Sequence, residues 1–323
     1  MSALPMPLRL KLSRDDRPIA IAALFIGAIL VAGTVYTWAR FGSAPLLSPT
    51  YLLLQLQIGA FLGIVAAGMM IVILISQIDL SAPWTLTAAA MMATAVGGFW
   101  AIPIALGIGL AVGIVNGLGI AYLRVPSMIF TLGVNAVMRG LMVAHTGGFA
   151  PQTEATPLMR SLAAERTFGI PNALFVWIAV SVLIVLLLRR APLGRYIYAI
   201  GNKESAAYLA GVNTKLVTVI CFALCGLASG IAGVLLAGYS QKAYQGMGDA
   251  YLLPAIAAVV IGGTNILGGR GRYLGTLLGV ILIVLLNSVL SIMDMPEAGR
   301  QAIYGSVIIL MLLVYGRGER VTS

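Results

Sequence analysis

Long apolar stretches alternate with short polar segments along most of the chain. Each of the longer stretches is near the roughly 20 residues that a helix needs to cross a bilayer. The predicted helices cover about residues 18–39, 51–76, 82–97, 100–123, 127–145, 172–190, 214–239, 273–293 and 297–316. One further apolar run, residues 254–263, is too short, because even a start at Ala250 gives a helix of only about 21 Å against a hydrocarbon core of about 30 Å. The pattern predicts an all-α polytopic membrane bundle of about ten transmembrane elements, one of them a short discontinuous helix.

Composition agrees with a membrane protein and excludes a separate soluble domain. The 323 residues are 60% hydrophobic and only 9% charged, whereas soluble domains carry about 25% charged residues. We therefore expect residues 1–323 to form a single transmembrane domain.

The net charge of +10 raises the possibility of a nucleic-acid partner, so the placement of the charges decides. With a cytoplasmic N-terminus, fourteen Lys and Arg residues fall inside, five fall outside, and Arg139 lies within a span. The fourteen are Arg9, Lys11, Arg14, Arg17, Arg124, Arg189, Arg190, Arg195, Lys203, Lys215, Arg270, Arg272, Arg317 and Arg320, and the five are Arg40, Arg160, Arg166, Lys242 and Arg300. The positive-inside rule therefore predicts that both termini are cytoplasmic, with no nucleic-acid partner.

The same orientation assigns the segments between the spans. Residues 1–17 form a cytoplasmic tail, residues 146–171 a periplasmic loop and residues 191–213 a cytoplasmic loop. The apolar run after the basic tail is long enough to stay in the membrane as an anchor, so we do not interpret it as a signal peptide.

Glycines recur at helical spacing in several spans, as at Gly109, Gly113 and Gly117 and at Gly226 and Gly230. In lipid, such small residues let helix backbones approach closely. This pattern predicts a tightly packed bundle and not a chemical site.

Residues 263–270, GTNILGGR, look at first like a phosphate-binding loop. Such a loop needs Lys followed by Ser or Thr, because the Lys holds the phosphates and the hydroxyl holds the magnesium. Gly269 and Arg270 stand in those two places. We therefore expect neither ATPase activity nor a bound cofactor in this chain.

No residue pattern favours an enzyme or a metal site. His145 is the only histidine and lies at the outer end of a predicted helix, and no serine has the G-x-S-x-G surroundings of a hydrolase nucleophile. Cys221 and Cys225 share one helix face, but further metal ligands are absent nearby. Two small buried residues are the simpler interpretation.

Uncharged polar residues lie within the predicted spans and need polar surroundings, because facing lipid would be costly. They are Gln55, Gln57, Asn116, Asn135, Asn265 and Asn287. Hydrogen bonding between helices is one interpretation, and a passage for a hydroxylated solute is the other. Of these residues, Gln55, Gln57, Asn116, Asn135 and Asn287 are the candidate translocation path.

The acidic residues Asp79, Asp249 and Asp294 fall at the ends of predicted spans, so they do not form an intramembrane proton relay. Asp79 or Ser81 is expected to cap the helix that begins near Pro83. Asp249 is a helix cap or a solute ligand, and a helix beginning there would direct backbone N–H groups toward the outer vestibule.

The cytoplasmic segment GNKESAAYLAGVN predicts a helix of about eight residues, too short to be stable alone in water. Asn202 suits its N-cap, Glu204 its first turn, and Gly211 the position after its end. Its one-sided face carries Ser205, Tyr208, Leu209 and Val212. Such a face must dock on its own bundle or on another protein.

Three stretches resemble the permease subunits of ABC importers for monosaccharides, the ribose, xylose and galactoside group. VPSMIFTLGVNAVMRG (125–140) is similar to the entry of that family's fifth helix, and GRYIYAIGNKESAAYLAGVN (194–213) to its cytoplasmic loop. AIAAVVIGGTNILGGRGRYLGTLLGVILI (255–283) resembles the family's signature of paired glycines after a short apolar run. The resemblance extends over nearly the whole chain.

The resemblance implies a half-transporter in the bacterial inner membrane. A second permease, identical or different, would complete the passage, a periplasmic binding protein would deliver the solute, and two cytoplasmic ATPases would bind the ATP and Mg. The coupling helix for the ATPase would comprise Asn202, Lys203, Glu204, Ser205, Tyr208, Leu209 and Gly211. The family-motif positions are Asp79, Ser81, Asp249, Gly262, Gly263, Gly268 and Gly269.

One motif departs from the family. The usual GGIDLSVGS is replaced by SQIDLSAPW at residues 76–84, which implies either a different solute or a partner permease that carries the regular motif. A monosaccharide or related polyol is the expected cargo. A nucleoside, a branched-chain amino acid or a sugar-like signalling molecule is the alternative within the superfamily, and a secondary transporter driven by an ion gradient is the rival class.

Overall fold

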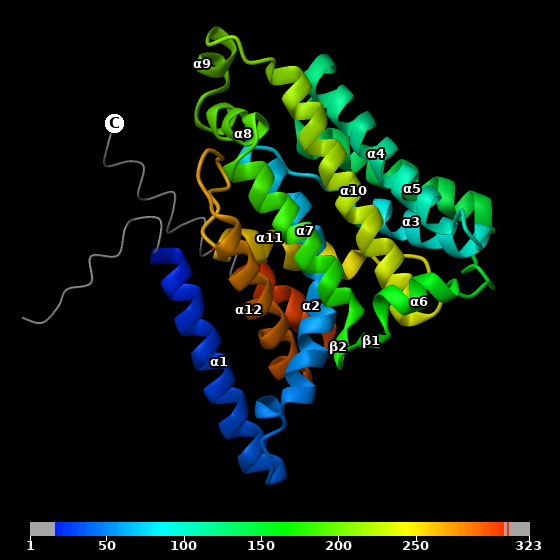
Figure 1. The fold of residues 1–323 in the computed structure, drawn as a ribbon, viewed down its shortest axis with the longest axis vertical. Helices are drawn as coiled ribbons and strands as arrows, with labels where there is room; N and C mark the ends of the chain where they lie inside the picture. Colours follow the sequence, from blue (N-terminus) through cyan, green and yellow to red (C-terminus); the bar gives the residue numbers. More distant parts are fainter. Residues whose placement is uncertain (1–16, 307–308, 310–323) are drawn as a thin grey trace, which may run out of the picture.

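The computed structural model describes residues 17–306 and residue 309 and is almost entirely helical (Figure 1). Within these described residues, seven helices are long and apolar enough to cross a membrane. They are α1 (Arg17–Phe41), α2 (Pro49–Leu74), α4 (Ala101–Leu123), α5 (Ser127–Thr146), α7 (Asn172–Arg189), α10 (Thr214–Ser240) and α12 (Tyr273–Ile292). The predicted polytopic helical bundle is therefore confirmed, and the predicted spans agree with these helices to within a few residues.

Two apolar elements are shorter. One is α3 (Ala82–Val96), and the other is the 3-10 helix η2 (Asp249–Tyr251) followed directly by α11 (Leu252–Ile261). The second of these is the predicted short discontinuous helix. Residues 297–306 and 309 are helical as predicted, whereas the other residues of that predicted span and residues 1–16 of the tail lie outside the described residues.

Both long loops contain more structure than their sequences predict. Residues 146–171 hold α6 (Pro157–Ala163) and a hairpin of β1 (Arg166–Thr167) and β2 (Ile170–Pro171). Residues 191–213 hold two helices, α8 (Pro192–Asn202) and α9 (Glu204–Leu209). The short α6 and α8 each begin with a proline in the first turn, where its missing N–H is not needed.

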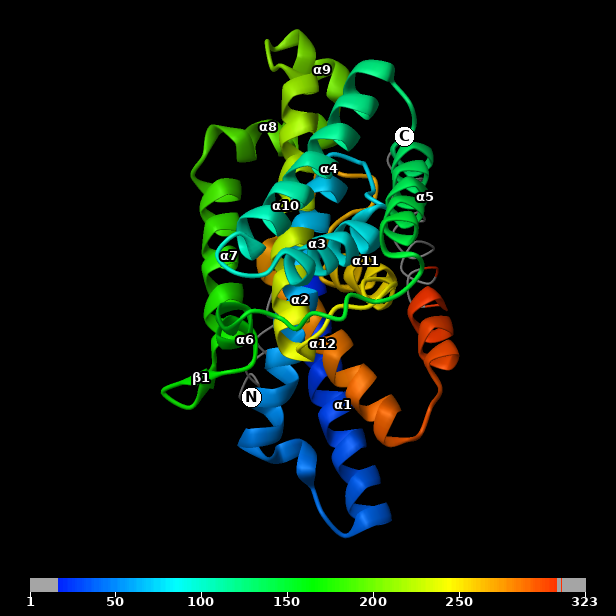
Figure 2. The same ribbon diagram turned by 90° about the vertical axis from the view of Figure 1, so that its right-hand side faces the viewer.

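Helix α2 is the centre of the bundle. In its most apolar part 89% of the residues are buried, against 11% in α1 and 17% in α5, so the last two helices lie at the periphery. Helix α2 packs against α7, α10, α11 and α12, and α10 packs in turn against α3 and α4. Figure 2 shows α2 and α10 in the middle, with α7 on one side and α5 on the other.

Glycines account for the close contact between α4 and α10. A Cβ atom added at Gly109 would lie 2.3 Å from the carbonyl oxygen of Gly226, and one added at Gly226 would lie 2.1 Å from the carbonyl oxygen of Gly109. A Cβ at Gly113 would likewise meet the backbone of Phe222 at 2.3 Å. These are contacts between backbones, which no side-chain movement can relieve.

The polar segments lie at opposite ends of α10 (Figure 1). Its first residue, Thr214, follows α9 closely in the chain, and beyond its last turn Gln241 accepts a hydrogen bond from the Ala155 amide at 2.8 Å. At the same end, Gly238 packs against the backbone of Met159 in α6. Helices α8 and α9 therefore lie at one end of the bundle and α6 with the β-hairpin at the other.

The glycine contact predicts a position-specific effect of alanine along α4. Gly109→Ala should lower the free energy of unfolding by about 1–3 kcal/mol, because α10 must move away. Gly107→Ala is the matched control, because nothing lies within 4 Å of a Cβ built there. Thermal unfolding of the two purified variants in detergent measures the difference, and equal melting temperatures would contradict the packing described.

Candidate functional site

Asp79 lies inside the bundle with only 2% of its surface exposed, and the neighbouring Ser81 is fully buried. The Ser81 hydroxyl donates to Asp79 Oδ1 at 2.6 Å, and the Ser81 backbone N–H donates to the same oxygen at 2.9 Å. The Asn116 amide of α4 donates to Ser81 Oγ at 2.7 Å and also lies 3.4 Å from Asp79 Oδ1. This buried carboxyl group is thus hydrogen-bonded from its own loop and from α4.

The loop between α2 and α3 also has its backbone tied to α5. The Leu80 N–H donates to Thr131 Oγ1 at 3.0 Å, and the Ile78 N–H donates to Ser127 Oγ at 3.3 Å. Buried non-helical backbone is stable only where protein or water satisfies its polar groups. Side chains of α5 therefore accept the backbone hydrogen bonds that a continuous helix would have made.

Of the predicted capping roles, only the N-cap position of Ser81 in α3 is confirmed. Ser81 directly precedes α3, but within the described chain neither its side chain nor that of Asp79 bonds an N–H of the first turn of α3. Their polar atoms bond to each other and to Asn116 instead. Asp249 is not the cap of its helix either, because Gly248 holds that position and Asp249 begins η2.

Asp249 belongs to a second cluster, which joins three elements. Its carboxylate is stabilised electrostatically by the Trp84 side chain of α3 and by Arg139 of α5. The Arg139 guanidinium carbon lies 5.7 Å from the centre of the Trp84 ring, which is a cation–π contact. Trp84 is 4% exposed, whereas Arg139 and Asp249 are exposed on the surface of the chain. The sequence marks Arg139 and the unusual Trp84, but it does not show that they meet.

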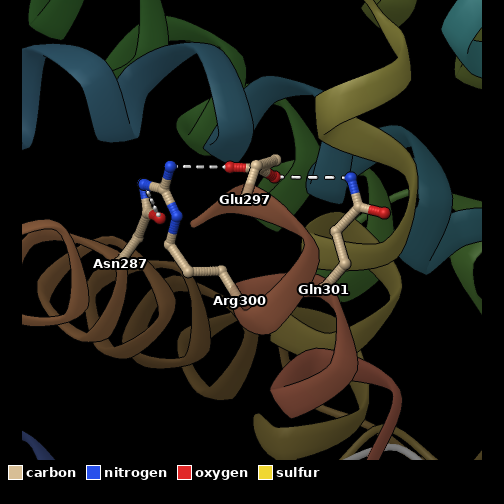
Figure 3. Close-up of polar contacts among 4 residues, drawn as sticks. All are labelled: Asn287, Glu297, Arg300 and Gln301. Atoms are coloured by element: carbon tan, nitrogen blue, oxygen red, sulfur yellow. Dashed lines mark hydrogen bonds and ion pairs between the residues drawn. The ribbon is translucent and has the colours of Figure 1, made fainter. Parts of the chain in front are cut away.

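The candidate path residues have different partners and do not converge. Gln57 donates to the Ala163 carbonyl of α6 at 2.8 Å, and Asn116 belongs to the Asp79 cluster. Asn287 Oδ1 accepts from Arg300 at 2.9 Å (Figure 3). These three amides therefore hold elements together, in agreement with hydrogen bonding between helices, the first interpretation of these residues.

Arg300 in turn forms an ion pair with Glu297 at 2.9 Å, so Asn287 anchors the start of the last helix to α12 (Figure 3). Gln55 is half-buried in α2. Asn135 of α5 is also half-buried, and within residues 17–306 and 309 its Oδ1 has no hydrogen-bond partner.

The glycine-rich segment 262–272 packs against the end of α2 and against α8. The Gly269 N–H donates to the Leu74 carbonyl at 3.0 Å, and Ser76 Oγ donates to the Leu267 carbonyl at 2.6 Å. Gly268 and Gly269 have φ values of +85° and +72°, which side-chain-bearing residues rarely adopt. The turn therefore requires glycine for backbone geometry.

The other two motif glycines lie where α11 ends. A Cβ at Gly262 would lie 2.4 Å from the Gly275 carbonyl of α12, and one at Gly263 would lie 2.4 Å from the Pro18 side chain. Close helix contact accounts for both. Within the part of the chain that the structure describes, no group of three or more His, Cys, Asp or Glu side chains could hold a metal ion.

Tyr198 connects α8 to this segment, because its hydroxyl donates to the Gly271 carbonyl at 2.9 Å. Burial raises the pKa of Tyr198 above its ordinary value, although the positive charges of Arg189 and Arg272 counteract part of the rise. The hydroxyl therefore stays protonated and able to donate across the physiological pH range.

Helix α9 differs at its start from the prediction. Asn202 is the last residue of α8 and not the N-cap of α9; its side chain donates back to the Tyr198 carbonyl at 2.9 Å. Lys203 takes the N-cap position, and Glu204 lies in the first turn. The helix therefore has six residues and not about eight.

The end of α9 follows the sequence pattern. Gly211 has a φ of +86°, its N–H donates to the Tyr208 carbonyl, and the Val212 N–H donates to the Ala207 carbonyl, which together form a Schellman motif. Ala207 is buried and Val212 is half-buried against the bundle. Leu209 is 85% exposed.

The residues of the predicted one-sided face of α9 are thus divided between the bundle and the surface. Tyr208, at 68% exposed, and Ser205 share the outer side with Leu209. The helix docks on its own bundle through small contacts and presents its two largest side chains outward.

Helices α8 and α9, the glycine signature and the buried Asp79 loop all lie within the part of the chain that matches a known family. Residues 51–314 match the family described as branched-chain amino acid transport system / permease component. The chain belongs to this family. It is therefore a multi-pass permease of a binding-protein-dependent ABC importer in the bacterial inner membrane, and such a permease component has no ATPase activity of its own.

Curated relatives of this permease include ribose import permeases. It is 35% identical to ribose import permease protein RbsC of Haemophilus influenzae over 77% of this chain and 80% of the relative. It is also 35% identical to the protein of that name from Bacillus subtilis over 83% of this chain and 85% of the relative. Autoinducer 2 import system permease protein LsrD of Photorhabdus laumondii is 30% identical over 91% of this chain and 89% of the relative. No solved structure matches this permease.

These relatives confirm the resemblance to sugar-importer permeases that the motifs indicate. Membership in a binding-protein-dependent importer family also implies ATPase and binding-protein partners in general terms.

The buried cluster predicts that Asn116 stabilises the permease. Asn116→Ala should lower the free energy of unfolding by about 1–3 kcal/mol, because it removes the donor to Ser81 and leaves buried polar atoms unsatisfied. Asn135→Ala is the matched control, since the Asn135 Oδ1 has no hydrogen-bond partner in the described chain. Thermal unfolding in detergent compares the variants, and an equal loss in both would contradict the role assigned to Asn116.

Proposed function

We propose that this permease forms the membrane passage of an ATP-driven importer for a monosaccharide or a related polyol. The observation that carries the proposal is its 35% identity to ribose import permeases over about four fifths of both chains. A neutral, hydroxylated cargo is also compatible with the uncharged polar groups in the spans and with the absence of an acidic proton relay among the described spans.

The proposed topology has about ten transmembrane elements and cytoplasmic termini. It is supported by the charge distribution of the sequence and by the separation of α8 and α9 from α6 along α10. In this orientation α9 faces the cytoplasm and α6 with the β-hairpin faces the periplasm.

The proposed assembly contains a second permease, two cytoplasmic ATPase domains and a periplasmic binding protein. ATP and Mg bind to the ATPases, and this chain binds no cofactor. The replacement of the usual motif by SQIDLSAPW favours a partner permease that differs from this chain.

Helix α9 is the proposed contact with the ATPase. Its Schellman end, its buried Ala207 and its exposed Tyr208 and Leu209 support this role, because a rigid short helix with two large exposed side chains suits insertion into a groove. Lys203, Glu204 and Ser205 border the same exposed surface.

Reconstitution tests the proposed function. Liposomes that contain the permease, the second permease and the ATPases should import radiolabelled D-ribose, D-xylose or D-galactose only with ATP and the binding protein. Uptake by the permease alone, driven by an ion gradient, would instead show a secondary transporter and overturn the proposal.

Autoinducer 2 is a second candidate cargo, because the relative from Photorhabdus laumondii covers 91% of this chain. Competing uptake of autoinducer 2 and the sugars into the same liposomes distinguishes the two cargoes. Preferential uptake of autoinducer 2 over all three sugars would favour this candidate.

The proposed coupling role predicts the effect of a charge at the tip of α9. Leu209→Asp should lower ATP-driven uptake and ATPase co-purification at least tenfold, because loss of a central interface side chain costs about 2 kcal/mol or more. The variant should still insert and fold, since Leu209 is 85% exposed.

Leu158→Asp provides the matched control. Leu158 is 58% exposed and lies on α6, at the other end of the bundle, so the same substitution there should leave ATPase binding intact. Unimpaired uptake in Leu209→Asp would refute the coupling role of α9.

A further inference from the structure

Arg139 carries a charge within a membrane-spanning helix. It lies twelve residues after the start of α5 and seven before its end, which is about 18 Å and about 10 Å along the helix axis. Charged side chains at such depth face a partner, a cavity or a pathway, because contact with lipid is costly. The surroundings of Arg139 therefore indicate what this face of the permease meets.

Two of the partners of Arg139 come from other elements. The guanidinium lies 5.7 Å from the centre of the Trp84 ring, and the Asp249 carboxylate attracts it electrostatically. The Trp84 side chain also stabilises the Asp249 carboxylate electrostatically. Trp84 thus contacts both charged groups while it is itself 4% exposed.

The backbone fixes the two elements on which Trp84 and Asp249 lie. The Gly248 N–H donates to Thr87 Oγ1 at 3.0 Å, and a Cβ added at Gly248 would lie 2.0 Å from the Pro83 carbonyl oxygen. The first turn of α3 and the start of η2 are therefore in direct backbone contact. Trp84 and Asp249 each directly follow one of the two touching residues, Pro83 and Gly248.

The charged ends of this cluster do not point into the core. Arg139 and Asp249 are exposed on the chain, whereas Trp84 is buried behind them. The positive charge of Arg139 and the negative charge of Asp249 give the pair a net formal charge of zero. An exposed Arg139 within a span, beside the opposite charge of Asp249, is suited to a polar pathway and not to lipid.

We propose that Arg139 and Asp249 contact the hydroxyl groups of an uncharged, polyhydroxylated solute as it passes through the importer, and that Trp84 is the positioning residue for both. The inference rests on the proposed function and adds the residues that recognise the cargo. Trp84 replaces a small residue of the usual family motif in SQIDLSAPW, so the site belongs to this chain in particular.

The chemistry of the pair matches neighbouring hydroxyl groups. A guanidinium offers several N–H donors in a fixed plane, and a carboxylate offers only acceptors. Adjacent hydroxyls each donate and accept, so one diol satisfies both groups. A solute that lacks one hydroxyl leaves a charged group without a partner, which disfavours it strongly.

Uptake kinetics in the complete reconstituted importer test the inference, with the labelled sugar that the wild-type complex carries best among D-ribose, D-xylose and D-galactose. Arg139→Gln and Asp249→Asn should each lower kcat/KM of uptake about tenfold or more, the effect of losing one charge-assisted hydrogen bond. Trp84→Phe keeps the aromatic ring but removes the N–H, and should raise KM. Adding Trp84→Phe to Arg139→Gln should have little further effect, because Trp84 acts through the charged groups.

A second readout is the preference for the sugar over its deoxy analogue. The same binding protein serves every variant, so its own preference cancels from the comparison. Asp249→Asn and Arg139→Gln should reduce the wild-type preference several-fold. The matched controls Arg166→Gln and Asp294→Asn, which alter exposed charges elsewhere, should leave both uptake and preference unchanged.

Charge reversal separates solute recognition from a structural ion pair. If the double variant Arg139→Asp, Asp249→Arg restored wild-type uptake, the pair would be structural or would join two permeases, and the inference would be wrong. If Arg139→Gln and Asp249→Asn matched wild type in uptake and preference, the inference would be wrong, whereas the proposed function would stand. Failure of the wild-type complex to import any of the sugars would overturn both the inference and the proposed function.

Discussion

The hydrogen bonds that satisfy the loop between α2 and α3 are the constraint on which this structure depends. Where the chain leaves a helix within a packed bundle, the freed backbone groups need protein partners, because a buried polar group without one is costly. Here Ser127 and Thr131 of α5 receive the loop N–H groups, and Asn116 of α4 holds Ser81 beside Asp79. Those contacts fix where α3 begins, and therefore where its first turn meets η2.

The sequence predicts most of the helices and few of the contacts between them. Apolar length alone locates the long spans, because each must satisfy the same membrane thickness. Helix α8 is missed because Pro192, Gly194 and Gly201 resemble loop residues, although its buried face packs on the bundle. The predicted start of α9 at Asn202 is wrong because a side chain that suits an N-cap also suits the last turn of a preceding helix.

The candidate site shows a similar division. Family motifs identify Asp79, Ser81 and the paired glycines, but their roles depend on partners that are distant in the sequence. Asn116 follows Ser81 by 35 residues, and Trp84 and Asp249 are farther apart still. Periodicity cannot reveal such pairs, because many arrangements of the same helices satisfy the same apolar pattern. Thus the fold class can be predicted from the sequence, whereas the residues that meet in each cluster can be identified only from the three-dimensional structure.

The contact of α8 with the end of α2 determines how movement passes through the permease. A Cβ at Gly201 would lie 1.9 Å from the Leu74 carbonyl oxygen and 2.4 Å from the Gly269 nitrogen, so the three backbones touch without intervening side chains. Side chains can change rotamer and absorb a small displacement, but touching backbones cannot. A displacement of α8 would therefore move the end of α2 and the 262–272 segment directly, because no flexible side chain lies between their backbones.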